Sequence, residues 1–402
     1  MVTEKTRLKD IVKNSSNVLY FYGVMYPEYK TIWDRLVYML RVGFFMGFMF
    51  AGLVVSAIAN MFHSRNDVGK LMDSFFITVT NLMAIVKFIT IHRNQPLLLK
   101  LIDQGDRREF QPRSDDQRNY LKSYVKFCND ITVMLCVSTL ITICMWCILA
   151  FIGGNEHSLP VPAYFPFNID TTIVFALISI YLTASSILGG TLGLSTDWLI
   201  ASLVIVVKVQ LHFLNDTLCN IKKLAEEDVK KGRAESVDTS YEMQLRNHMN
   251  QKLIECIVHH QYIIKFAREV NKLFSISILG QLGVSVICIC ATLYEIRESF
   301  ENKVKAISVC IYMFCMLMQV FPICYYTNEV IAESHIIPTS AYHSSWEDCS
   351  KEYKQNVYIF MLNTRRIIRF CAGGLIDLST DVFINIIKTS WSYFTIIGQM
   401  DS

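Results

Sequence analysis

The chain has 402 residues, of which 52% are hydrophobic and only 18% are charged, and its mean hydropathy is +0.33. This composition exceeds what a soluble domain of the same length needs for its core, which excludes an ordinary soluble protein and indicates an integral membrane protein. The net charge of +3 is small, and membrane topology accounts for its basic excess, so nucleic acid is not an expected partner.

The first 41 residues are polar and lack the apolar stretch and small residues of a cleaved signal peptide, so we expect the first apolar run to act as a signal anchor. Seven runs approach or exceed the roughly 20 residues that a helix needs to cross a bilayer. The predicted transmembrane helices are 42–62, 71–91, 131–153, 171–207, 274–294, 306–328 and 376–399.

Lysine and arginine alternate from one connection to the next. The connections on one side hold 30 of these residues and those on the other side hold 5, while Lys87, Lys208 and Lys388 lie inside the spans or at their edges. The positive-inside rule makes the richer side cytoplasmic. We therefore predict a cytoplasmic N-terminus and an extracellular C-terminus, the reverse of a G-protein-coupled receptor.

Residues 208–273 are predicted to form a long cytoplasmic helical loop. Apolar residues recur at helical spacing from Lys208 to Lys231 and from Tyr241 to Lys272, with a turn around Gly232 to Asp238. Amphipathic helices outside the membrane must bury their apolar stripes, so we expect helical extensions of the fourth and fifth spans to form a cytoplasmic anchor domain. The predicted fold is a single all-α integral membrane domain over 1–402 with seven transmembrane helices.

The seventh span differs from the others because it is strongly polar on one side. On a helical wheel its polar residues fall within one sector of about 80°. They are Asp377, Asp381, Asn385, Lys388, Ser392, Thr395 and Gln399. Charged groups facing lipid near the helix centre would each cost roughly 3 kcal/mol, so this stripe must face protein or water.

Two interpretations of the stripe remain open. The helix is buried within its own bundle with its polar groups satisfied by neighbours, or it lines a pore where several copies meet around water. The length of the stripe favours the pore, and acidic groups toward its cytoplasmic end favour cations. Lys388 opposes a cation path unless it pairs with Asp381 or Asp377 or lies at the edge of the stripe.

The sequence offers no support for an enzyme. It has no glycine-rich phosphate loop, no His-Glu-x-x-His zinc motif and no Gly-x-Ser-x-Gly elbow. His259 and His260 are adjacent and would point about 100° apart on a helix, so we predict no metal site there. No cofactor is expected.

Residues after about position 195 resemble a known family. They are Asp197, Gln210, His259, His260, Gln261, Phe266, Asn271, Leu273, Phe274, Ser275, the stretch Gln319–Tyr325, Ser334, Ala341, Tyr342, Trp346, Ala372, Gly373, Leu378, Ser379, Phe383, the stretch Ser390–Thr395, and Gln399. Together they resemble the closing signature of insect odorant receptors. Gustatory receptors share the spacing from Tyr393 to Gln399, but Ser-Trp-Ser before it favours the odorant branch. Gly374 and Ile367 depart from the pattern, where Lys and Pro are usual.

The resemblance implies an odorant-gated, nonselective cation channel, a tetramer in which tuning subunits assemble with a shared co-receptor. It puts the hydrophobic gate of the pore at Ile396, with Gln399 and Met400 at the outer mouth. The connection between the fourth and fifth spans is shorter than in the co-receptors, which suggests a tuning subunit.

In this family the odorant pocket lies in the outer half of the bundle, among the second, third, fourth and sixth spans. Thr139, Thr142 and Trp146 share one face of the third span and offer an aromatic wall with hydroxyls. Tyr181 and Tyr312 would add aromatic surface and a hydrogen bond. Ordinary packing is the alternative role for each of these side chains.

The resulting interpretation is an odorant receptor tuning subunit, located in the plasma membrane of olfactory sensory neuron dendrites. Its expected partners are a small volatile odorant, the co-receptor in a heterotetramer, and membrane lipid. The alternatives are a gustatory receptor channel and, from other classes, a G-protein-coupled receptor or a small-molecule transporter. A transporter would usually show two related halves, and we find no internal repeat.

Overall fold

The computed structural model describes residues 7–25, 31–65, 68–152, 159–167, 169, 171–232, 241–298 and 303–400. The described chain is almost entirely helical. In chain order its elements are η1 (Leu8–Ile11), α1 (Lys13–Phe21), α2 (Ile32–Gly43), η2 (Phe44–Ala51), α3 (Gly52–His63), α4 (Val68–Arg93), α5 (Gln95–Gln104), η3 (Arg108–Phe110), α6 (Asp115–Ile152), α7 (Thr172–Cys219), α8 (Ile221–Gly232), α9 (Tyr241–Glu298), α10 (Lys303–Tyr342), α11 (Lys351–Thr364), β1 (Cys371–Ala372), β2 (Ile376–Asp377) and α12 (Thr380–Met400).

Six helical stretches are long and apolar enough to cross a membrane. They are Ile32–His63, Ser74–Arg93, Asp115–Ile148, Thr172–Cys219, Tyr241–Arg297 and Ala306–Tyr342. Each contains most or all of one of the first six predicted spans, and several continue well beyond it. The first stretch passes through the π-helical turns of η2. The less apolar α12 is not among the six. It carries both apolar and charged side chains, among them Asp381 and Lys388.

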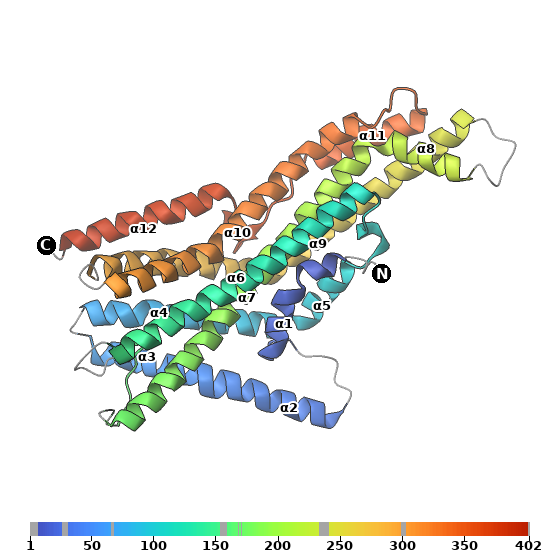
Figure 1. The fold of residues 1–402 in the computed structure, drawn as a ribbon. Coiled ribbons are helices and arrows are strands. Elements are labelled where there is room, and N and C mark those ends of the chain that lie inside the picture. Colours follow the sequence, from blue (N-terminus) through green and yellow to red (C-terminus); the bar gives the residue numbers. More distant parts are fainter. Residues whose placement is uncertain are drawn as a thin grey trace.

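The longest helices run through the whole molecule. Figure 1 shows α7, α9 and α10 side by side, with the C-terminal end of α12 at one end of the molecule and α8 and α11 at the opposite end. This arrangement separates the two ends of the bundle that the charge pattern assigns to opposite sides of the membrane.

The anchor region forms where α7, α8 and α9 pack beyond the predicted spans. The predicted apolar stripe is buried there: Leu211, Leu214, Leu218 and Ile221 are all fully covered. Lys252 on α9 pairs with an Asp228 carboxylate on α8 at 2.8 Å. The extensions of the fourth and fifth spans are therefore helical as predicted, while the predicted turn lies almost wholly in 233–240, outside the described residues.

The two adjacent histidines belong to this packing. His259 Nε2 lies 2.7 Å from Gln210 Oε1 on α7, and the His260 ring meets the ring of Phe360 on α11 edge to face. Both histidines are buried. The two histidines thus place α9 in contact with α7 and with α11.

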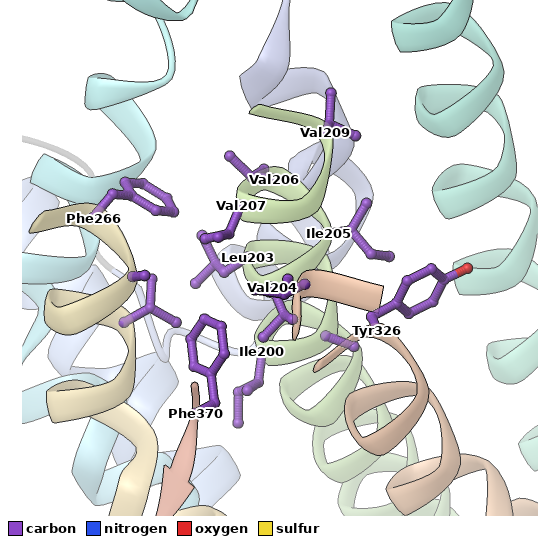
Figure 2. Packing of buried hydrophobic residues seen from close by; sticks show 14 of the residues in the cluster. Ile200, Leu203, Val204, Ile205, Val206, Val207, Val209, Phe266, Tyr326 and Phe370 are labelled. Atoms are coloured by element: carbon purple, nitrogen blue, oxygen red, sulfur yellow. The ribbon is translucent and has the colours of Figure 1, made fainter. Parts of the chain in front are cut away.

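The middle of α7 is the centre of the core. Every residue from Thr191 to Leu211 is buried, which fits a helix that is apolar nearly all round. Figure 2 shows Leu203, Val204 and Val207 of α7 among Phe266 of α9, Tyr326 of α10 and Phe370, which precedes β1. The middle of α7 thus packs against α9, against α10 and against the chain that leads into α12.

The start of the last helix was predicted wrongly. The helix begins at Thr380, and Ile376–Asp377 form β2, which pairs with β1 in a short antiparallel hairpin. Asp377 is therefore not part of the helical stripe. Its carboxylate pairs with the Arg369 guanidinium at 3.0 Å, instead of with Lys388.

Candidate functional site

A cavity of about 90 Å³ lies between α4, α6, α7, α9 and α10. Three glycines of α7, Gly189, Gly190 and Gly193, form one wall of it. A Cβ atom at Gly190 would lie 2.8 Å from Thr139 Cγ2 on α6, so the absence of a side chain there permits close approach of the two helices. Residues from five helices line this space, and its wall is mostly apolar with a few polar side chains, a composition typical of small-molecule sites.

Four of the five predicted pocket residues line this cavity. They are Thr139, Thr142, Trp146 and Tyr312. The Trp146 and Tyr312 ring centroids are 5.5 Å apart, and the Tyr312 hydroxyl lies 3.1 Å from Thr80 Oγ1 on α4. Trp146 and Tyr312 therefore form an aromatic wall with one fixed hydroxyl.

Tyr181 does not line the cavity. It packs in a neighbouring apolar cluster with Leu53 and Ile178, and a Cβ atom at Gly52 would lie only 2.0 Å from its hydroxyl oxygen. Of the two predicted roles, packing describes this side chain.

A buried ion pair lies at one side of the cavity. The Lys87 ammonium on α4 is 2.6 Å from Asp197 Oδ1 on α7, and the side chains are only 3% and 7% exposed. The ammonium also donates to Gln281 Oε1 on α9 at 2.5 Å. Gln281 Nε2 donates in turn to Gln319 Oε1 on α10 at 2.7 Å. We call Lys87, Asp197, Gln281 and Gln319 the polar network; it joins four helices.

The prediction of the pocket missed this network. From the sequence, Lys87 is recognisable only as a charge within a span, and Asp197 only as part of the family resemblance. An ionisable residue inside a membrane span is itself a signal of a functional site with a partner, and that signal was present at Lys87. Its partner is 110 positions away in the chain, beyond the reach of local periodicity.

The polar stripe of α12 faces away from the subunit's own bundle. Ile386 and Ser390 are buried on the side that packs against α9 and α10. Asp381, Asn385, Lys388, Ser392 and Thr395 are all exposed on the other side. The alternative in which the stripe is satisfied inside its own bundle is therefore wrong for these five residues.

The predicted gate lies on the exposed surface of the same helix. Ile396 is 53% exposed, about 40° round the helix from Ser392 at 100° per residue. Gln399 and Met400 belong to the last turn of α12, but their side chains lie outside the described residues. Their predicted position at the outer mouth stays a prediction.

Helix α9 connects the cavity with the chain leading into α12. Asn271 Oδ1 accepts from the Cys371 amide at 2.8 Å, and the Gly373 amide donates to the Ser275 carbonyl oxygen at 3.0 Å. Farther along the same helix, the Val286 carbonyl accepts from Ser390 Oγ at 3.2 Å. Gln281 lies between these contacts, so one helix touches both the cavity and two points of the last helical segment.

Asn271, Ser275, Gly373 and Ser390 are also among the residues that carry the family resemblance. Their contacts give the resemblance a physical meaning, because each helps to hold α12 or its preceding hairpin on α9. Gly373 has φ +61°, and a Cβ atom there would lie 2.4 Å from Leu279 Cδ2. Only glycine fits that position without displacement.

Comparison with protein families gives a match over most of the chain. The model of the family described as "7tm Odorant receptor" matches residues 67–391. Odorant receptor Or1 of Anopheles gambiae is 24% identical over 396 residues, covering 96% of this chain and 94% of the relative. Odorant receptor 46a, isoform A, of Drosophila melanogaster is 24% identical, covering 87% of each chain.

Solved structures with the same fold come from a third insect. The olfactory receptor OR5 of Machilis hrabei superposes with a TM-score of 0.78 at 16% identity, covering 97% of each chain. A structure of that receptor in complex with eugenol gives a TM-score of 0.79 at 14% identity, covering 98% of this chain and 97% of the receptor. These matches extend over the cavity, α9 and α12 alike.

Proposed function

This chain belongs to the insect odorant receptor family, and we propose that it is the tuning subunit of an odorant-gated, nonselective cation channel. In this proposal a small volatile compound binds in the cavity between α4, α6, α7, α9 and α10. The α12 helices of neighbouring subunits surround the pore, which is closed at Ile396. The channel works in the plasma membrane of olfactory sensory neuron dendrites.

The observation that carries the proposal is the outward-facing stripe of α12. Five polar or charged residues are exposed on a helix that the subunit does not cover. In a membrane such a surface requires protein or water beside it. One subunit has a single helix of this kind among its described residues, so a water-filled path requires several subunits, which supports assembly with a co-receptor into a tetramer.

The cavity supports the ligand-binding half of the proposal. Its mixed wall of apolar, aromatic and polar side chains suits a small organic molecule, and a receptor of the same fold has been solved in complex with eugenol. Ligand binding would open the channel only if the ligand binds the open state more tightly than the closed one. Helix α9 offers the physical connection, because it contacts both the cavity and α12.

Recording of odorant-evoked current tests the proposal. The full chain is expressed with and without a co-receptor subunit, surface expression is confirmed by labelling, and a broad panel of volatiles is applied. We expect an inward, nonselective cation current that requires both a ligand and this chain. A complete lack of current with both arrangements, in cells that display the chain at the surface, would contradict the channel.

A further inference from the structure

We propose that the cavity selects neutral volatiles that carry a hydrogen-bond acceptor, carbonyl compounds above all, and that Lys87 and Gln319 are the residues that recognise this group. The inference deepens the proposed function, since it assumes that the cavity is the odorant site. It concerns the chemical class of the ligand.

The orientation of both amides in the polar network is fixed by the ammonium. A lysine ammonium can only donate, so the atom of Gln281 that faces Lys87 at 2.5 Å must be its oxygen. The Gln281 nitrogen then faces Gln319, whose oxygen must be the accepting atom at 2.7 Å. The two N–H groups of Gln319 are thereby left for another partner, and they have no acceptor among the residues that the structure describes.

Lys87 has one donor left as well. Its three N–H groups are shared between Asp197 Oδ1 and Gln281 Oε1, and the described chain supplies no third acceptor. Lys87 and Gln319 both line the cavity. The polar network thus presents donors to the cavity, while the Gln281 and Gln319 oxygens are already engaged.

The two threonine hydroxyls on the α6 side of the wall add no competing donor. Thr139 Oγ1 donates to the Leu135 carbonyl at 2.8 Å and Thr142 Oγ1 donates to the Ser138 carbonyl at 2.9 Å. Their protons are used within their own helix. A ligand oxygen that only accepts, such as that of a ketone or an ester, therefore matches the donors of Lys87 and Gln319 and leaves no donor of its own unsatisfied.

Charge argues against ionised ligands. Asp197 neutralises Lys87 at 2.6 Å, so the network has no net charge to attract a carboxylate. The second carboxylate oxygen of Asp197 has no hydrogen-bond partner within the described residues, but Asp197 lines a separate cavity of about 10 Å³ and not the larger one. An ammonium ligand in the larger cavity would meet the Lys87 ammonium, whereas the compensating Asp197 carboxylate does not line that cavity. Burying an unpaired charge is costly, so both ion types are excluded.

The size of the site is set partly by Gly193. A Cβ atom there would meet nothing closer than Ala84 Cβ at 4.0 Å, and both residues line the cavity. Gly193→Ala therefore adds a methyl group to the wall without a clash or a change in polar groups. It serves as a control that alters space alone.

The test compares functional groups at constant carbon skeleton. Methyl ketones from butanone to nonanone are applied to the full chain expressed with a co-receptor, and the best length is then compared with the alkane, carboxylic acid and primary amine of that length. Two readouts are used: the current, and the ligand-dependent thermal stabilisation of the purified chain. We expect the ketone to act at a concentration at least about tenfold lower than any of the other three.

Variants of Gln319 assign the recognition. Gln319→Met should reduce the ratio between ketone and alkane to less than about threefold. Gln319→Glu keeps an acceptor for Gln281 but replaces the N–H donors, so it should weaken the ketone and favour the amine, a reversal that a folding defect cannot produce. Gly193→Ala should shorten the optimal chain and leave the preference for the ketone unchanged.

The outcomes separate this inference from the proposed function. Stabilisation by the ketone without any current would support the recognition of carbonyl groups and contradict the channel. Three results would overturn the inference, with or without a current. The alkane could be as potent as the ketone, or the acid or amine could be more potent. The ratio between ketone and alkane could also stay unchanged in a well-expressed Gln319→Met variant.

Discussion

At the scale of single residues, Lys87 and Asp197 form an ion pair in which both side chains are buried. Both are buried within the membrane-spanning part of the bundle, where an uncompensated charge is far more costly than a matched pair. Their role is thus defined by the pair and not by either residue.

Replacing one member of this ion pair should destabilise the fold much more than replacing both. Lys87→Met leaves the Asp197 carboxylate unpaired and is expected to destabilise the fold by roughly 3–5 kcal/mol, with loss of surface expression. The double variant Lys87→Met, Asp197→Leu should recover much of that expression. Surface labelling of the variants measures this, and a double variant no better than Lys87→Met would show that the ion pair is not what stabilises this region.

His259 makes the anchor region sensitive to acid. Burial, together with the nearby charges of Arg113 and His260, lowers the pKa of His259 to about 3, whereas the unfolded chain protonates near 6.5. Between these values the unfolded state binds more protons, so stability is full above about pH 6.5 and falls as the pH drops toward 3.

We therefore expect the melting temperature of the purified chain to fall between pH 7 and pH 5, and to fall less in His259→Gln. Glutamine can still donate a hydrogen bond to Gln210 but does not titrate. His260 contributes in the same direction, since burial lowers its pKa to about 4. An equal pH dependence in the wild type and the variant would rule out His259 as a source of it.

At the scale of elements, the hairpin before α12 is one part of the fold that the sequence did not reveal. The first six spans and the amphipathic extensions were predicted because their patterns are local, with long apolar runs and helical spacing. The two-residue strands Cys371–Ala372 and Ile376–Asp377 are too short to give a pattern, and their position depends on contacts with α9.

The same distinction explains the errors in the candidate sites. Asp377 falls in phase with the stripe on a helical wheel, but two glycines with positive φ, Gly373 and Gly374, turn the chain and delay the helix to Thr380. The wall of the cavity on α6 was predictable from spacing within one helix. The polar network was not, because its four members come from four helices.

The two glycines offer a matched pair of variants. An alanine at either position is strained by positive φ, at about 1–2 kcal/mol, but only Gly373→Ala also places a methyl group 2.4 Å from Leu279, since the position of Gly374 is open. We expect Gly373→Ala to reduce the odorant-evoked current strongly at equal surface expression and Gly374→Ala to retain most of it. Similar currents in both variants would mean that the packing of the hairpin on α9 does not matter for gating.

At the scale of the whole molecule, the separation of the two ends of the bundle agrees with the charge asymmetry. Helix α8 of the anchor region and the neighbouring α11 lie at the end opposite the C-terminal end of α12 (Figure 1). From the 30 lysines and arginines of one set of connections, the positive-inside rule predicts that this end lies in the cytoplasm.

Epitope tags at the two termini test this orientation. A C-terminal tag should be stained in intact cells, and an N-terminal tag only after permeabilisation. Asn215-Asp216-Thr217 is a potential glycosylation motif on the side that the charge pattern makes cytoplasmic, so we expect Asn215 to carry no glycan. Staining of the N-terminal tag alone in intact cells would reverse the topology.

The central claim is that the exposed face of α12 lines the conducting pathway. Ser390 and Ser392 provide the most direct comparison, because they are two positions apart and face nearly opposite directions: Ser390 is buried against α9, and Ser392 is exposed on the stripe. Each is replaced by cysteine, the chain is expressed with a co-receptor, and a charged, membrane-impermeant thiol reagent is applied during odorant-evoked current. The unsubstituted chain, treated in the same way, measures the effect of the reagent on the native cysteines.

The account predicts lasting block of the current in Ser392→Cys, whereas Ser390→Cys should be blocked no more than the unsubstituted chain. Block in Ser390→Cys with none in Ser392→Cys, or no added block in either variant, would contradict it.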